Sequence, residues 1–180
     1  MKEKIRKVVY GSTAMGKTRY CRDLCRKYEK SGHDVVTNIQ GLINNSLLRE
    51  VDKNKENIFN DYNIIKTTYS RIEKDMILSI KEYIVASGDV LILEDIDCLI
   101  SSYDFHCIID MLSEEGPMQD LWDIVVISGY SLEAMNLVED TSVTPVVFIT
   151  QNKDGEIMIN EIKEPRGDID DRYYETLMQQ

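Results

Sequence analysis

One segment, Gly11–Thr18, limits the possible folds of this chain more than any other feature. It reads Gly-Ser-Thr-Ala-Met-Gly-Lys-Thr and fits the pattern G-x-x-x-x-G-K-[ST] without a mismatch. An apolar run from Ile5 to Tyr10 precedes it and predicts a buried strand, and a helical pattern from about Gly16 to Lys30 follows it. A glycine-containing loop between a strand and a helix is typical of phosphate-binding loops. The segment therefore predicts an α/β fold organised around such a loop.

The residue types of this loop suit the chemistry of a bound triphosphate such as ATP. Gly11 and Gly16 let the backbone turn and bring its N–H groups close to phosphate oxygens. The helix N-terminus adds partial positive charge. Lys17 is expected to reach the β- and γ-phosphates, and the Thr18 hydroxyl is expected to ligate Mg²⁺. The predicted nucleotide-binding residues are Gly11, Ser12, Thr13, Ala14, Met15, Gly16, Lys17, Thr18 and Ser128.

A second apolar run ends in acidic residues, and a loop of this kind needs a carboxylate for its Mg²⁺. Val90–Leu93 predicts a strand buried on both faces of a parallel sheet, and Glu94, Asp95 and Asp97 follow it. A carboxylate at the end of a neighbouring strand completes the Mg²⁺ shell. Glu94 and Asp95 are the candidate metal ligands with Thr18, and they join Lys17 as the predicted catalytic residues. Adjacent strand residues point to opposite faces, so we expect one of the two acids to face the metal, and the sequence leaves open which.

A further apolar run, Ile124–Ile127, predicts another buried strand with Ser128 at its tip. A hydroxyl at this position either senses the γ-phosphate or serves as an ordinary turn residue at the strand end. Both interpretations stay open at the level of the sequence.

The rest of the chain alternates between strand and helix patterns. Strands are predicted at Val35–Ile39 and Tyr62–Thr68, helices at Leu42–Val51, Ser70–Ala86, Tyr103–Ser113 and Leu132–Val138, and a polar connector at Asp52–Asn57. Two late apolar runs, 146–150 and 157–162, flank Asp154-Gly155, which is a strong hairpin signal. The fold class is therefore α/β, with three layers, a mostly parallel central sheet and a C-terminal antiparallel hairpin. We expect one domain over residues 1–165, followed by a charged tail over 166–180.

Charge and composition narrow the possible partners. Residues 1–30 carry ten Lys/Arg and three Asp/Glu, a net charge of +7, and subtracting this from −11 leaves −18 for the remainder. An acidic chain binds nucleic acid poorly without a local basic patch, so nucleic acid is a possible but not a favoured partner. A basic stripe on the first helix is either a solvated face or a surface for an acidic partner: Arg19, Arg22, Arg26 and Lys30. No apolar run approaches the roughly 20 residues of a membrane span, and no signal peptide is recognisable, so we expect a cytoplasmic protein.

The order of these features resembles the RecA-type ATPases, and most closely their archaeal recombinase-like and KaiC-like branch. The second arm of the hairpin, Ile157–Gly167, is similar to the closing strand of that branch with its Lys-x-x-Arg-Gly ending. The resemblance covers essentially the whole chain. It implies that Gly11–Thr18 bind ATP or ADP and that Glu94 or Asp95 is the Walker B acid. It also implies assembly into a homo-oligomer, or with a protein partner, because members of the family form rings or filaments.

The chain departs from this family after the second predicted strand. The catalytic glutamate of the family usually follows that strand, whereas this chain has Gln40 between Ile39 and Gly41. A glutamine can position a water molecule but cannot act as a base. The expectation is a weak Mg²⁺-dependent ATPase that acts as a nucleotide-dependent switch or assembly subunit. Two alternatives stay open: a small-molecule kinase of the nucleoside type, and a structural subunit that binds ATP without turnover.

Overall fold

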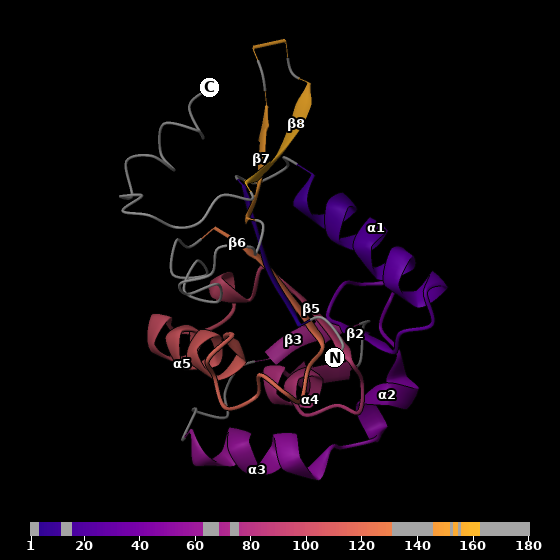
Figure 1. The fold of residues 1–180 in the computed structure, drawn as a ribbon, viewed down its shortest axis with the longest axis vertical. Helices are drawn as coiled ribbons and strands as arrows, with labels where there is room; N and C mark the ends of the chain where they lie inside the picture. Colours follow the sequence, from indigo (N-terminus) through magenta and orange to yellow (C-terminus); the bar gives the residue numbers. More distant parts are fainter. Residues whose placement is uncertain are drawn as a thin grey trace.

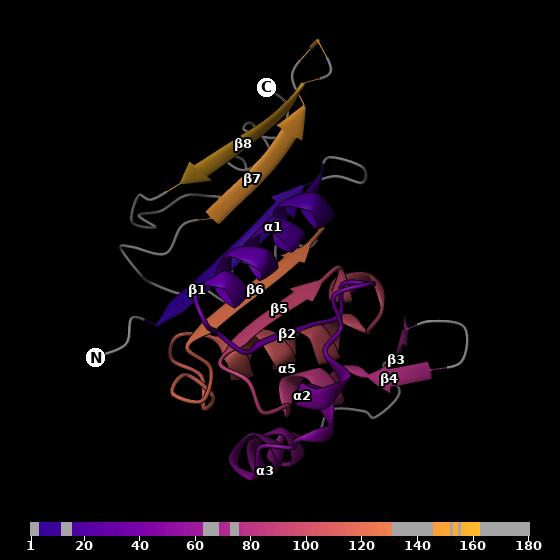
Figure 2. The same cartoon turned by 90° about the vertical axis from the view of Figure 1, so that its right-hand side faces the viewer.

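A computed structural model gives the fold, and it describes residues 4–11, 16–62, 69–72, 76–130, 146–151, 153–154 and 156–162. A six-stranded sheet with the order β2-β5-β6-β1-β7-β8 lies at the centre, between helices (Figure 1). Its strands are β1 (Ile5–Gly11), β2 (Val35–Thr37), β5 (Val90–Glu94), β6 (Ile124–Gly129), β7 (Val146–Gln151) and β8 (Ile157–Ile162). The first five of these run parallel, and β8 pairs antiparallel with β7. Figure 2 shows β1 inside the sheet, with β6 on one side and β7 on the other. The carboxyl end of β1 therefore lies between the ends of other strands.

Helices cover both faces of the sheet, as the continuous apolar runs predict. The helix α1 (Lys17–Lys30) packs on one face, where Cys21, Leu24 and Cys25 meet Val90 and Ile92 of β5. On the other face, Leu91 and Leu93 of β5 meet the remaining core helices, which are α3 (Lys53–Asp61), α4 (Ile80–Ile84) and α5 (Ser102–Leu112). Alternate residues of one strand thus serve two separate cores, because strand side chains point to opposite faces. The predicted α/β fold with a mostly parallel sheet is confirmed, and β7 and β8 form an antiparallel pair.

The predicted helix over Ser70–Ala86 is wrong. The segment forms an antiparallel pair, β3 (Tyr69–Ile72) and β4 (Met76–Ser79), and then the short helix α4. Its isoleucines repeat at helical spacing, but β-branched residues also favour strands, and strand pairing supplies a partner that periodicity does not reveal.

The predicted polar connector Asp52–Asn57 is also wrong, because most of it belongs to α3. The Asp52 side chain accepts hydrogen bonds from the backbone N–H groups of Asn54 and Lys55 at 2.9 and 3.3 Å. This is an N-cap, and it begins a helix in a sequence whose polarity suggested a loop. Tyr62, the expected start of a strand, instead ends α3.

Smaller differences concern element lengths. The helix predicted over 42–51 is reduced to α2 (Asn45–Arg49), and β2 ends at Thr37 rather than Ile39. A 3₁₀ turn, η1 (Ile96–Cys98), follows β5. The remaining parts of the predicted elements 62–68 and 132–138, and the tail 166–180, lie outside the described residues.

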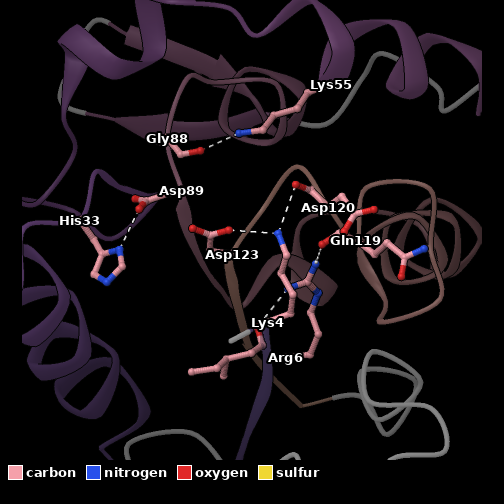
Figure 3. Close-up of polar contacts among 10 residues, drawn as sticks. Lys4, Arg6, His33, Lys55, Gly88, Asp89, Gln119, Asp120 and Asp123 are labelled. Atoms are coloured by element: carbon pink, nitrogen blue, oxygen red, sulfur yellow. Dashed lines mark hydrogen bonds and ion pairs between the residues drawn. The ribbon is translucent and has the colours of Figure 1, made fainter. Parts of the chain in front are cut away.

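Two buried cations join elements at the amino ends of the strands (Figure 3). The Arg6 guanidinium donates hydrogen bonds to the carbonyl oxygens of Leu112 at 2.7 Å and Gln119 at 3.1 Å, so it ties β1 to the end of α5. The Lys55 ammonium, on a side chain that is 1% exposed, donates to Ala86 O at 2.9 Å and Gly88 O at 2.7 Å. It also lies 3.2 Å from the ring centroid of Trp122. Each cation satisfies carbonyl groups that burial would otherwise leave unpaired.

The buried position of Lys55 predicts a pH-dependent stability. Burial lowers the pKa of Lys55 from 10.5 to about 8. Between these values the folded protein has released a proton that the unfolded chain still holds, so the free energy of unfolding rises with pH in this window. In urea unfolding, we expect the free energy of unfolding of the parent to rise by up to about 3 kcal/mol more than that of Lys55→Met between pH 8 and 10.5. Parallel pH profiles for the two proteins would contradict this interpretation.

Candidate functional site

The candidate site lies at the carboxyl ends of β1, β5 and β6. In the sheet, Ser128 of β6 is in register with Glu94 of β5 on one side and with Val9 of β1 on the other. The loop predicted to bind phosphate leaves β1 at Gly11, and α1 begins at Lys17. Parallel strands place their carboxyl ends at one edge, and ligands of open α/β sheets bind in the crevice at that edge.

Two glycines of the motif, Gly11 and Gly16, occupy positions where a side chain would be strained or would clash. Gly16 caps α1 with φ 94° and ψ 16°, a left-handed conformation in which a side chain is strained. A Cβ atom added to Gly11 would lie 2.8 Å from the carbonyl oxygen of Ile149 in β7. The intervening residues Ser12, Thr13, Ala14 and Met15 lie outside the described part of the chain.

Lys17 lies at the centre of the site, and its side chain is 4% exposed. Its ammonium donates a hydrogen bond to the carbonyl oxygen of Gly11 at 2.8 Å and lies 3.9 Å from Asp95 Oδ1. It also lies 3.7 Å from the ring centroid of Tyr130, a cation–π contact. The predicted phosphate-binding cation is therefore held by three neighbours that come from three different strand ends.

Thr18 and Glu94 are brought together directly. The Thr18 hydroxyl donates a hydrogen bond to Glu94 Oε1. The backbone of Glu94 is fixed in turn by Asn38, whose side chain accepts from Glu94 N at 2.7 Å and donates to Glu94 O at 2.9 Å. Asn38 follows the last residue of β2, and its side-chain amide takes the place of a further backbone pair with β5. Sequence reasoning missed Asn38, since an amide after a strand has no signature that identifies its partner.

Asp95 contacts Lys17 and Tyr130 through its carboxylate. It has φ 49° and ψ 32°, a left-handed conformation that few non-glycine residues adopt, although aspartate tolerates it better than most. Burial raises the pKa of Asp95 above its ordinary value, and the carboxylates of Glu94 and Asp97 add to this rise, while Lys17 opposes it. The two candidate acids are thus separated: Glu94 contacts the hydroxyl of the loop and Asp95 contacts its lysine.

Asp97 holds the end of β6. Its Oδ2 accepts a hydrogen bond from the backbone N–H of Tyr130 at 2.7 Å. A Cβ atom on Gly129 would lie 2.6 Å from the same oxygen, so a larger residue there would displace this carboxylate. Tyr130 also donates from its hydroxyl to Asp95 Oδ2 at 3.4 Å. Tyr130 is the second residue of the site that sequence reasoning missed, because its contacts depend on the turn after β5.

Ser128 lies beside the site but is fully buried. Its side chain shares the α1 face of β6 with Val126, and it lies next to Cys21 of α1. Burial raises the pKa of the Cys21 thiol, and the Ser128 hydroxyl opposes that rise. The backbone carbonyl of Ser128 accepts from Asp95 N at 2.9 Å, which ties the turn after β5 to β6. Its predicted contact with a γ-phosphate stays a prediction.

A hollow of about 530 Å³ opens beside the loop and is lined by Gly16, Thr18, Arg19, Arg22, Asp23 and Arg26. Arg22 donates to the backbone carbonyl of Gln40 at 3.1 Å, and Arg26 pairs with Asp23 at 3.5 Å. Part of the basic stripe therefore borders the candidate site. Gln40, where the RecA-type glutamate is expected, has an exposed side chain.

The described residues contain no group of three or more His, Cys, Asp or Glu side chains that could hold a metal ion. Within the same part of the chain, no helix combines the length and the apolar character that crossing a bilayer requires.

Comparison with known proteins places no family name on this arrangement. No protein-family model matches the chain, and no curated protein sequence matches it.

Proposed function

We propose that the chain binds ATP with Mg²⁺ at Gly11–Thr18, in the manner of a RecA-type ATPase, and hydrolyses it slowly. The observation that supports this most is the convergence of Lys17 and Thr18 on two acids at the end of β5. A lysine and a hydroxyl at one helix N-terminus, close to carboxylates at the end of another strand of the same sheet, are the groups that bind a triphosphate with its metal.

The donor set fits a magnesium ion that is shared with phosphates. Mg²⁺ is usually held by one or two carboxylates, a hydroxyl and substrate oxygens, so a cage of three acidic side chains is not needed. Thr18 and Glu94 would hold the ion, which would neutralise charge on the phosphate chain. Burial is the main cause of the raised pKa of Asp95, and the carboxylates of Glu94 and Asp97 add to it. A bound cation would favour the charged forms of these acids.

The roles of the other residues follow from their contacts. Lys17 would leave Gly11 O and bind the phosphate oxygens. Asp95, which is not engaged with Thr18, would orient or deprotonate a water molecule. Slow turnover is expected because Gln40 offers no carboxylate after β2. ATP would then act as a signal for assembly with further copies or with a protein partner.

The metal dependence of binding tests this proposal. We expect the parent to bind ATP at least about 10-fold more tightly with Mg²⁺ than with EDTA, because charge-assisted contacts contribute about 1.5–3 kcal/mol. Glu94→Gln should lose most of this difference while keeping its affinity in EDTA. Isothermal titration measures both, with Glu114→Gln, outside the site, as the matched control. Equal affinity of the parent for ATP with and without Mg²⁺ would contradict the proposal that Glu94 binds the metal.

The arginine-lined hollow favours one second candidate, a small-molecule kinase. Guanidinium groups next to Thr18 suit an anionic acceptor of a phosphoryl group. Phosphate transfer from ATP to an anionic small molecule such as a nucleoside monophosphate, in the absence of comparable phosphate release to water, would favour this candidate.

A further inference from the structure

Tyr130 occupies a position that neither the loop motif nor the acid-ended strand explains. It follows the last residue of β6, and its ring faces the Lys17 ammonium at 3.7 Å. Aromatic rings attract a cation through the negative charge of their faces, most strongly where water is excluded. Lys17 is almost completely buried in this arrangement.

The ring is held in place from two sides. Asp97 binds the Tyr130 backbone N–H at 2.7 Å, and Asp95 accepts from its hydroxyl at 3.4 Å. Gly129 allows the close approach of Asp97, since a Cβ atom there would lie 2.6 Å from the carboxylate. Two carboxylates and one glycine thus define where the ring lies.

We propose that Tyr130 is a positioning residue that holds Lys17 in a withdrawn state and competes with the phosphate chain for its ammonium. The inference rests on the proposed function and adds a regulatory contact to it. The same ammonium cannot donate to Gly11 O, face the ring and bind phosphate oxygens without moving. A bound triphosphate must therefore offset the loss of the Tyr130 contact, and the apparent affinity is lower than the site would otherwise have.

The shielding of Lys17 is tested without any nucleotide. Brief acylation with acetic anhydride, followed by peptide mass spectrometry, reports the accessibility of each lysine amine. We expect Tyr130→Leu, which keeps an apolar side chain but removes the ring face, to acylate Lys17 about 3- to 30-fold faster than the parent. Tyr130→Phe keeps the ring and should match the parent within about 2-fold. Lys53, which is 81% exposed, is the internal reference and should react equally in all three proteins.

The competition is tested by ATP titration of the same three proteins in Mg²⁺. Tyr130→Leu should bind ATP about 3- to 30-fold more tightly than the parent, and Tyr130→Phe should bind like the parent. Circular dichroism establishes that each variant is folded, and an unfolded Tyr130→Leu is replaced by Tyr130→Met. Equal or weaker binding by the ring-free variant overturns the competition. Absence of ATP binding by all three proteins overturns the proposed function instead, and acylation alone then decides the shielding of Lys17.

Discussion

Replacing Lys17 with alanine is expected to weaken ATP binding by at least about 100-fold, because a buried ammonium that binds phosphate contributes several kcal/mol. Lys17 supplies a charge at the N-terminus of α1, beside the loop that would hold the phosphates. The backbone N–H groups of that loop remain in the variant, so the loss measures the side chain. Isothermal titration or equilibrium dialysis with Mg²⁺ present gives the Kd of each protein.

A matched control lies on the same helix. Lys30 is exposed in the last turn of α1, and Lys30→Ala should leave the Kd for ATP unchanged. Lys17→Ala also leaves Asp95 without its cation, so thermal unfolding of the variant must be followed in parallel. A folded Lys17→Ala protein that binds ATP as tightly as the parent would refute the nucleotide site.

Trp122→Ala is expected to lower the free energy of unfolding by about 3–5 kcal/mol, the usual cost of removing a buried aromatic side chain. Trp122 is fully buried, its indole N–H donates to Ile84 O at 3.2 Å, and its ring lies against the Lys55 ammonium. The alanine variant loses the packing, the hydrogen bond and the cation–π contact together. Urea unfolding followed by far-ultraviolet circular dichroism measures the change, because Trp122 is the single tryptophan of the chain.

A conservative variant separates these contributions. Trp122→Phe keeps a ring beneath Lys55 but loses the indole N–H, so we expect a smaller loss of about 1–2 kcal/mol. Combining Trp122→Ala with Lys55→Met should cost less than the sum of the single changes, since the two side chains contact each other. Additive effects would show that the Lys55–Trp122 contact does not contribute to stability.

Sequence patterns predicted the parallel sheet well because two of its inner strands, β5 and β6, are apolar on both faces. Val90–Leu93 and Ile124–Ile127 need no partner to be recognised, as their continuous apolar character already indicates burial from two sides. Patterns failed between residues 52 and 84, where polarity hid the capped helix α3 and isoleucine spacing imitated a helix over β3 and β4. The N-cap of Asp52 started the helix α3, and pairing with each other fixed β3 and β4 as strands. Sequence periodicity reveals neither interaction.

The candidate site was predictable in part. Lys17, Thr18, Glu94 and Asp95 follow from a motif and from an acid-ended strand, and the structure brings these four together. Asn38 and Tyr130 were not predictable, because their partners are distant in sequence and their residue types have many other uses.

The sequence by itself determined the strand β1 before the Gly11–Thr18 motif and the helix α1 that begins within it, since apolar runs and helical spacing are local signals. Only the tertiary structure separated the contacts of Glu94 from those of Asp95. The left-handed backbone at Asp95 turns its carboxylate toward Lys17 and Tyr130, while Glu94 stays in the strand and meets Thr18. The different contacts of the two acids depend on the turn after β5 and on its hydrogen bond to β6. Neither can be read from the segment Glu94–Asp97 alone.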